Sequence, residues 1–322
     1  AGASRPASLA SAWRALEAGD VGAARTGAEL ALEESMALRA DAAEADARLL
    51  LAELDRRAGA LAAAEAQIDR ALERRFALGR TPGTGEVAAE GARLAIQCGA
   101  FGRARALLHA AERDAATPVD RAHLLLALAD LELTLGHRAV ASDALRMVLS
   151  ELELADFEPG STLATRVLTT LLTLDPSPTI VAQGGERLAL FIRHQRPRLA
   201  AELAAALADA RRASGDLAGA ELAAAIACDA ALAGDDLPGS LLAHAAAHVA
   251  PPELVARAEA AGLRGLVAHL LRAAGDNTAA WQRLERLSRH LDVGDQYALA
   301  LEPWAVRAYD LARAQKPPRG PR

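Results

Sequence analysis

Alanine recurs at two fixed distances from six glycines along the chain, once seven residues before each glycine and once five residues after it. A turn glycine with a small residue on either side suits two helices that reverse direction and pack closely, so each match predicts one helix-turn-helix unit. Such self-similarity at a regular spacing is typical of a solenoid built from stacked repeats. The six sets, each written as upstream alanine, glycine and downstream alanine, are Ala12, Gly19, Ala24; Ala52, Gly59, Ala64; Ala92, Gly99, Ala104; Ala129, Gly136, Ala141; Ala208, Gly215, Ala220; and Ala268, Gly275, Ala280.

The residues between the glycines predict helices and exclude strands. Alanine, leucine, glutamate and arginine are strong helix formers and fill these segments. No segment alternates Val, Ile or Thr with polar residues as a half-buried strand does. Apolar residues make up 52% of the chain but aromatic residues only 3%, so Ala and Leu on closely spaced helices must fill the core. We therefore expect an all-α protein.

The spacing of the glycines predicts one further unit without a glycine marker. Successive glycines lie 40, 40 and 37 residues apart, and then Gly136 and Gly215 lie 79 residues apart, close to two periods. Asp175-Pro176-Ser177-Pro178 supplies a turn between them, with helices expected at about 161–174 and 179–194. We expect the second of these helices to be interrupted at Gly184-Gly185.

A stacked array grows linearly, so the 322 residues predict one continuous domain over residues 1–315 rather than two globular domains. The expected hairpins lie near 7–38, 40–78, 84–115, 117–155, 160–195, 197–233, 238–262 and 263–292. A capping helix is expected at 295–315, and residues 316–322 form a basic, proline-rich tail that we expect to be disordered.

The repeated unit resembles the tetratricopeptide repeat (TPR), which has a small residue in its first helix, a turn glycine, and two alanines and a large apolar residue on its second helix. The second alanine of that signature stands here at Ala31, Ala71, Ala111 and Ala227. The period near 40 residues is similar to the longer variety found in signalling adaptors and bacterial regulatory proteins. The resemblance covers about residues 7–292 and implies an α-α superhelix of about eight hairpins with a C-terminal cap. One departure is that leucine or alanine mostly replaces the large aromatic residues of the family's first helix.

The resemblance also implies a concave groove, lined by the first helices at positions thirteen, ten, six and three residues before each turn glycine. The groove residues are then Trp13, Asp46, Leu49, Glu53, Arg56, Glu86, Arg93, His123, Leu126, Asp130, Glu202, Asp209, Arg212, His269 and Arg272. Carboxylates lie in the outer rows and arginines nearer the turns, so we expect a partner protein or peptide with a basic segment. The alternative is that these charges form a solvated helix face, which any surface helix needs. The family's peptide-carboxylate clamp is not expected, because the only asparagine and the only lysine, Asn277 and Lys316, lie outside the groove.

Charge and cysteine content narrow the classes of partner and compartment. The formal net charge of −6 lacks the basic excess that nucleic-acid binding needs. Cys98 and Cys228 lie far apart in the chain and form neither a disulfide framework nor a metal knuckle, which favours a reducing, cytoplasmic location. No apolar run is long enough for a membrane span. The chain starts at Ala1 without methionine, so we expect it to be a piece of a longer protein.

Candidate chemistry in the sequence is sparse. His244 and His248 stand four residues apart on an expected helix, a spacing that suits two ligands of one metal ion. Ala245 occupies the position where a zinc protease carries its glutamate, and no third ligand is evident, so a packed or surface histidine pair is favoured. A basic cluster at Arg193, His194, Arg196 and Arg198 is interpreted as solvated surface. We expect no catalysis, no metal and no cofactor.

Three functions remain open from the sequence. The favoured one is a non-catalytic scaffold or adaptor that binds a partner along the groove. The second is a sensing domain of a larger bacterial regulator that holds a small ligand or regulatory peptide, for which an enclosed pocket near the fifth unit would be the discriminating feature. The third is an architectural subunit of an assembly.

We expect the substitution Ala104→Leu to lower stability by about 1–3 kcal/mol, because a bulky side chain would separate helices that must nearly touch. Urea unfolding of the two proteins measures the difference. An unchanged unfolding midpoint would show that the repeat register is misassigned.

Overall fold

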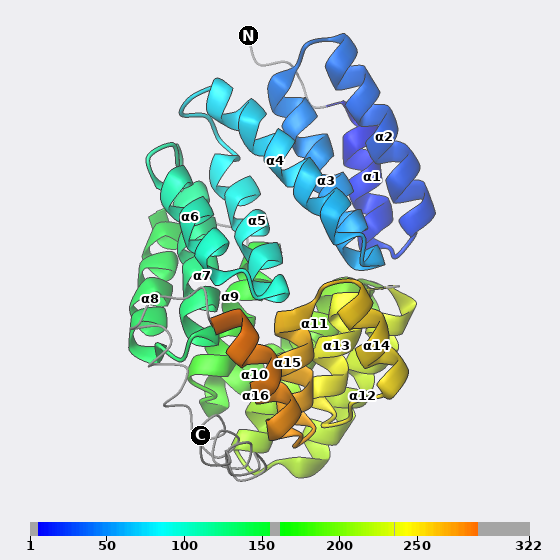
Figure 1. Ribbon diagram of the computed structural model, residues 1–322, viewed down its shortest axis with the longest axis vertical. Coiled ribbons are helices and arrows are strands. Elements are labelled where there is room, and N and C mark those ends of the chain that lie inside the picture. Colours follow the sequence, from blue (N-terminus) through cyan, green and yellow to red (C-terminus); the bar gives the residue numbers. More distant parts are fainter. Residues whose placement is uncertain (1–5, 155–161, 235, 289–322) are drawn as a thin grey trace, which may run out of the picture.

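Sixteen α-helices in eight consecutive pairs make up the described part of the chain, residues 6–154, 162–234 and 236–288 of a computed structural model. No strand occurs in these residues, and the helices follow an α-α superhelix, which confirms the predicted fold class (Figure 1). The expected cap at 295–315 and tail at 316–322 lie outside the described residues.

Each pair forms one hairpin, numbered one to eight along the chain. The first helices of the hairpins are α1 (Ala7–Glu17), α3 (Asp41–Ala58), α5 (Thr84–Cys98), α7 (Pro118–Thr134), α9 (Thr162–Leu174), α11 (Pro197–Ala213), α13 (Leu237–Ala246) and α15 (Arg264–Ala273). The second helices are α2 (Val21–Ala37), α4 (Leu61–Ala77), α6 (Phe101–Glu112), α8 (Arg138–Leu154), α10 (Pro178–Arg193), α12 (Leu217–Ala233), α14 (Pro252–Ala260) and α16 (Asn277–Ser288).

The repeated glycines and alanines take the positions that the pattern predicts. All six marker glycines have left-handed backbone, with φ between 77° at Gly99 and 88° at Gly136, which residues with a Cβ rarely adopt. The twelve flanking alanines are buried, none more than 3% exposed. Asp20, Asp216 and Asp276 accept hydrogen bonds from backbone N–H groups at the start of the following helix. These caps fix where the second helix of the hairpin begins.

Hairpin five lacks the glycine marker but is a complete helix pair. Pro178 occupies the first turn of α10, where its missing N–H leaves no hydrogen bond unmade. The expected interruption at Gly184-Gly185 is wrong, because α10 is continuous through both residues. A Cβ on Gly184 would lie 3.3 Å from Leu172 and from Leu207, so this glycine serves close helix packing.

The superhelix is wound so tightly that each early hairpin contacts the hairpin five places later. A Cβ on Gly19 would lie 3.4 Å from Pro197 of α11, and one on Gly59 would lie 3.0 Å from Leu237 of α13. A Cβ on Gly265 of α15 would lie 2.6 Å from the carbonyl oxygen of Ile96 at the end of α5. We call this line of contacts the seam. In Figure 1 it runs between α1–α4 above and α11–α14 below.

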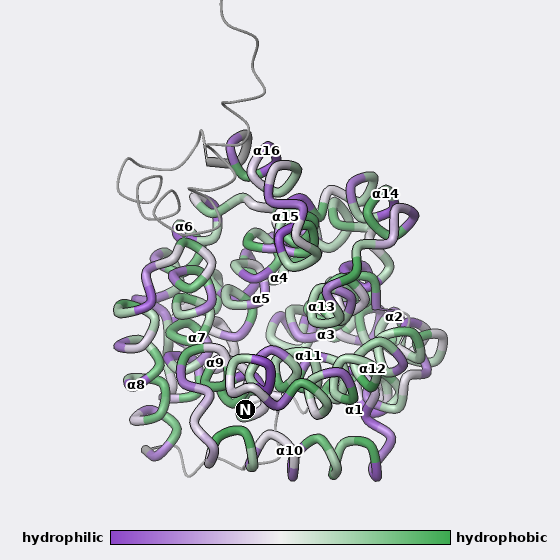
Figure 2. The backbone as a smooth tube through the Cα atoms, turned by 90° about the horizontal axis from the view of Figure 1, so that it is seen from below, coloured by the Kyte–Doolittle hydropathy of each residue, from purple (hydrophilic) through white to green (hydrophobic). Residues whose placement is uncertain are grey.

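The contact of α15 with α5 closes a ring. In this ring α5, α7, α9, α11, α13 and α15 each contact the next helix, and α15 contacts α5 again. Figure 2 shows these first helices around the centre, with α8, α10, α12 and α14 outside them. The first helices thus present their inner faces to one central space.

We expect Gly265→Ala to destabilise the protein, because its Cβ would displace α15 from the backbone of α5. Gly102→Ala is the matched control, since Gly102 is also helical and a Cβ there would meet nothing within 4 Å. The control should gain up to about 1 kcal/mol from helix propensity. Thermal unfolding compares the two variants, and equal gains in both would show that the seam is not a close contact.

Candidate functional site

A cavity of about 470 Å³ occupies the centre of the ring. Charged and hydroxyl side chains of α5, α7, α9, α11 and α15 line it, together with leucines. Its lining includes six of the groove residues expected from the sequence, namely Arg56, Arg93, Asp130, Glu202, His269 and Arg272. Six arginines line it in all, Arg56, Arg93, Arg138, Arg166, Arg198 and Arg272, against four carboxylates, Glu90, Asp130, Glu202 and Asp236.

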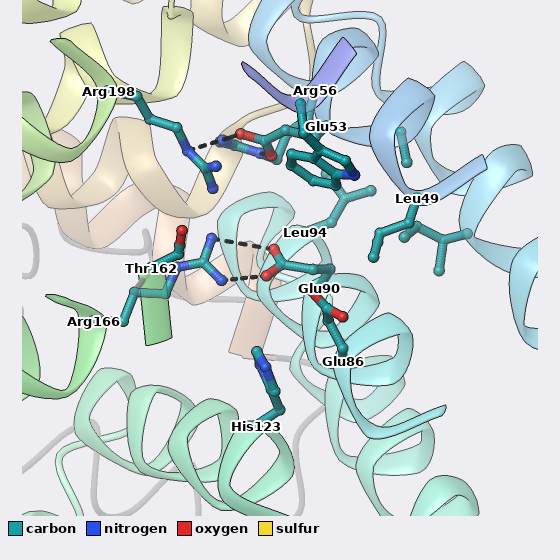
Figure 3. A pocket seen from close by; sticks show the side chains of 13 residues that line it. Leu49, Glu53, Arg56, Glu86, Glu90, Leu94, His123, Thr162, Arg166 and Arg198 are labelled. Atoms are coloured by element: carbon teal, nitrogen blue, oxygen red, sulfur yellow. Dashed lines mark hydrogen bonds and ion pairs between the residues drawn. The ribbon is translucent and has the colours of Figure 1, made fainter. Parts of the chain in front are cut away.

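A smaller cavity of about 70 Å³ lies beside it, between α1, α3, α5 and α7 (Figure 3). Its lining includes the expected residues Trp13, Leu49, Glu53, Arg56, Glu86 and His123. Four side chains line both cavities and therefore form the partition between them: Arg56, Glu90, Arg166 and Arg198.

Glu53 of α3 is surrounded by guanidinium groups. Its carboxylate lies 2.8 Å from Arg56 Nε, 3.0 Å from Arg57 Nε and 3.3 Å from Arg198 Nε. Burial by itself raises the pKa of Glu53, but the three guanidinium groups outweigh burial and lower this pKa well below its ordinary value. The pair with Arg198 crosses the seam, because it joins hairpin two to hairpin six.

Glu90 of α5 sits in a second such cluster. It accepts hydrogen bonds from Arg93 Nη1 at 2.9 Å and from Arg166 of α9, which also lies 3.8 Å from Glu202 of α11. Burial raises the pKa of Glu90, yet Arg166 and Arg93 together lower it to about 2. Figure 3 shows Arg166 reaching across to Glu90 in the smaller cavity.

Arg93 also connects this cluster to α7. Its Nε donates to Asp130 Oδ2 at 3.3 Å, and the Thr170 hydroxyl donates to Asp130 Oδ1 at 3.2 Å. Burial raises the pKa of Asp130 in spite of the neighbouring Arg93 and Arg166. Asp130 is therefore a weaker counter-charge for the arginines than Glu53 or Glu90.

Three buried polar atoms in the cavity walls have no hydrogen-bond partner among the described residues. They are Nη2 of Arg93 and Oε1 of Gln97 in the large cavity, and Nδ1 of His123 in the small one. Buried polar groups in folded proteins are almost always hydrogen-bonded, so such atoms call for an explanation.

The remaining expected groove residues lie elsewhere. Leu126 is fully buried in a core cluster with Leu145 and Val148, because the tight winding turns its position toward the neighbouring helix. Asp46 is buried against Arg75 of α4. Arg212 pairs with the exposed Asp209 and donates to a backbone carbonyl, and neither residue is in the lining of the two cavities.

Several lining residues were not foreseen from the sequence, including Glu90, Gln97, Arg166, Arg198 and the α9 threonines. The sequence did contain a signal for two of the threonines. The groove positions thirteen and six residues before a turn, counted back from the turn residue Asp175, are Thr162 and Thr169. Thr162 lines the small cavity and Thr169 the large one. The basic cluster is solvated surface only in part. Arg193 and His194 are exposed, whereas Arg196 lies 3.5 Å from Glu17 and the Arg198 side chain is only 11% exposed.

The histidine pair does not keep its helical spacing. The helix α13 ends at Ala246, and His248 lies beyond it with a left-handed φ of 58°. His244 Nδ1 donates to the Ser240 carbonyl at 2.8 Å. Among the described residues, no group of three or more His, Cys, Asp or Glu is arranged to hold a metal ion. No helix in the same part of the chain is both long and apolar enough to cross a bilayer.

Comparison with known proteins gives a likeness of fold only. No protein-family model matches the chain, and no curated protein is detectably similar to it. Among solved structures, a Rap protein in complex with Competence and Sporulation Factor is similar, with a TM-score of 0.49 and 12% sequence identity. The match covers 96% of this chain and 86% of that one. A likeness at this level carries no information about function.

The burial of His123 and His269 in the cavity walls predicts that the free energy of unfolding decreases in mild acid. Burial lowers the pKa of His123 to about 3 and that of His269 to about 4, from an ordinary value of 6.5, with Arg93 and Arg272 adding to the effect. The unfolded chain therefore binds more protons between about pH 6.5 and pH 4, so the free energy of unfolding falls as the pH falls through this range.

We expect the double variant His123→Gln, His269→Gln to lose less of its free energy of unfolding than the wild type between about pH 7 and pH 5, measured by urea unfolding. His109→Gln is the control, because that side chain is 79% exposed. Identical pH dependence in all three proteins would contradict the burial of these imidazoles.

Proposed function

We propose that this chain is a binding protein that holds a short peptide or protein segment inside the large cavity. The observation that carries the proposal is the cavity of about 470 Å³ at the centre of the ring of first helices, to which hairpin five and its neighbours contribute. That volume lies within the roughly 300–1,000 Å³ usual for ligand pockets. The first helices surround the cavity while it stays partly open to solvent, so a segment of another chain can enter it.

The composition of the lining supports a peptide-like occupant. Arginines and carboxylates are interspersed with the hydroxyls of Thr134, Thr169, Thr170 and Thr173 and with Leu133, Leu242, Leu266 and Leu284. Such a surface offers partners both to the polar backbone of an extended segment and to its apolar side chains.

The charged groups support binding rather than catalysis. Glu53 and Glu90 are held as carboxylates by two or three arginines each, and their lowered pKa values make them poor proton carriers near neutral pH. Within the two cavities, no serine or cysteine accompanies a histidine as a nucleophile would require.

We expect Thr169→Trp to abolish peptide binding, because the indole would occupy the cavity. Thr26→Trp is the matched control, since Thr26 lies on the exposed outer helix α2. Both hydroxyls donate to the carbonyl four residues earlier, at 3.2 Å for Thr26 and 3.0 Å for Thr169.

Peptides would be selected on the wild-type chain from a displayed random library and then titrated against all three proteins by fluorescence anisotropy. Thermal unfolding confirms that both variants are folded. Selected peptides that bind Thr169→Trp as tightly as the wild type would place binding outside the cavity and refute the proposal. A library that yields no specific peptide would refute it as well.

A further inference from the structure

We propose, building on the proposed function, that the occupant of the large cavity is acidic. Its carboxylate binds Nη2 of Arg93, and an N–H group beside that carboxylate donates to Oε1 of Gln97. The sequence favoured a basic occupant, and this proposal replaces that expectation with an acidic one.

Arg93 and Gln97 form one surface within the cavity. They stand one helical turn apart on α5, so their side chains share a face, and both line the large cavity. The other two nitrogens of Arg93 are used, because Nη1 donates to Glu90 and Nε donates to Asp130. Nη2 of Arg93 is a buried donor without an acceptor, and Oε1 of Gln97 is a buried acceptor without a donor. A ligand that supplies one acceptor and one donor side by side satisfies both atoms.

The charge of the lining selects an anion. Six arginines and four carboxylates line the cavity, an excess of two positive charges (6 − 4 = 2) in a chain whose net charge is −6. Glu53 lies outside this lining and does not reduce the excess, because Arg57, which is also outside it, supplies a matching positive charge 3.0 Å away. A cavity with protein walls concentrates the field of such an excess, so it attracts an anion more strongly than the same charges on a flat surface would.

The seam brings a second cationic residue to the same wall. A Cβ on Gly265 would lie 2.9 Å from the carbonyl oxygen of Gln97, so α15 abuts the last turn of α5. His269 and Arg272 follow on α15 and line the same cavity. Nη2 of Arg272 lies 3.3 Å from Nδ1 of His269, and a guanidinium can only donate, so the neutral imidazole carries its proton on Nε2. The end of the cavity nearest Gln97 is therefore rich in donors.

Two kinds of peptide carry a carboxylate next to an N–H group: one with an aspartate or glutamate side chain, and one with a free C-terminus. The test uses fluorescein-labelled hexapeptide pools with acidic, neutral or basic side chains, each made with an amidated or a free C-terminus. Anisotropy titrations against the whole chain give the dissociation constants. We expect at least about ten-fold tighter binding of the carboxylate-bearing pools than of the basic amidated pool.

Binding by the amidated acidic pool would identify the side chain as the source of the carboxylate. Binding by the neutral pool only when its C-terminus is free would identify the terminal carboxylate. Either result supports the proposal, whereas a basic amidated pool that binds as tightly as the acidic one overturns it.

Two variants locate the contact. Gln97→Met keeps the length of the side chain and removes the acceptor, and it should weaken the best pool about ten-fold. Arg93→Lys keeps the charge and removes Nη2, and it should weaken the same pool by a similar factor. Gln183→Met on the exposed face of α10 is the control and should leave binding unchanged. Full-strength binding by Gln97→Met and Arg93→Lys would overturn the assignment.

The result separates this inference from the function on which it rests. If Thr169→Trp abolishes binding of a neutral amidated or basic pool while the acidic pool does not bind, the cavity binds a ligand and only the acidic assignment fails. If no pool binds in a manner sensitive to Thr169→Trp, the proposed function fails with it.

Discussion

The close approach of neighbouring helices at alanine and glycine is the constraint on which the rest of this structure depends. The twelve alanines that flank the marker glycines are buried at the places where helices of a hairpin or of adjacent hairpins nearly touch. Small side chains there shorten the distance between helices, and the short distance winds the superhelix tightly. Tight winding brings each early hairpin onto the hairpin five places later, and this contact closes the ring around the cavity.

Buried charge pairs strengthen the same closure. In an ordinary solenoid each repeat contacts only its neighbours, so stability is nearly a sum of local terms. Here Arg198 pairs with Glu53 across the seam, and within the partition between the cavities Arg166 of hairpin five pairs with Glu90 of hairpin three. Glu53 and Glu90 each pair with an arginine of their own helix as well, so every long-range pair extends a local one. Hairpins distant in sequence are therefore coupled, and the array behaves more like one closed body than like an open spiral.

The side chains that hold the ring together also form the walls of the cavity, which explains its character. The carboxylates of Glu53 and Glu90 are paired with arginines, and one pair of each carboxylate joins helices of different hairpins. Arg93 is only partly used, because two of its nitrogens bind carboxylates and the third has no partner. Donors and acceptors without a partner in the protein are the atoms that can bind a ligand. The positions of charged residues along the chain do not reveal which atoms these are.

The sequence by itself determined the helical hairpins, because turn glycines, aspartate caps and buried alanines act over a few residues and leave a regular spacing. It also placed eleven charged, aromatic or apolar residues on the inner faces that line the two cavities, because helical offsets from a turn glycine recur from one hairpin to the next. Only the tertiary structure decided that the ring closes and that arginines outnumber carboxylates in the large cavity. It also decided that Leu126 packs in the core and that Asp46 pairs with Arg75, away from both cavities. These outcomes depend on small rotations between hairpins that add up over five units, and on pairs such as Arg166 with Glu90 that lie 76 residues apart. No local pattern encodes a sum of that kind, so the central cavity forms only when the whole superhelix is assembled.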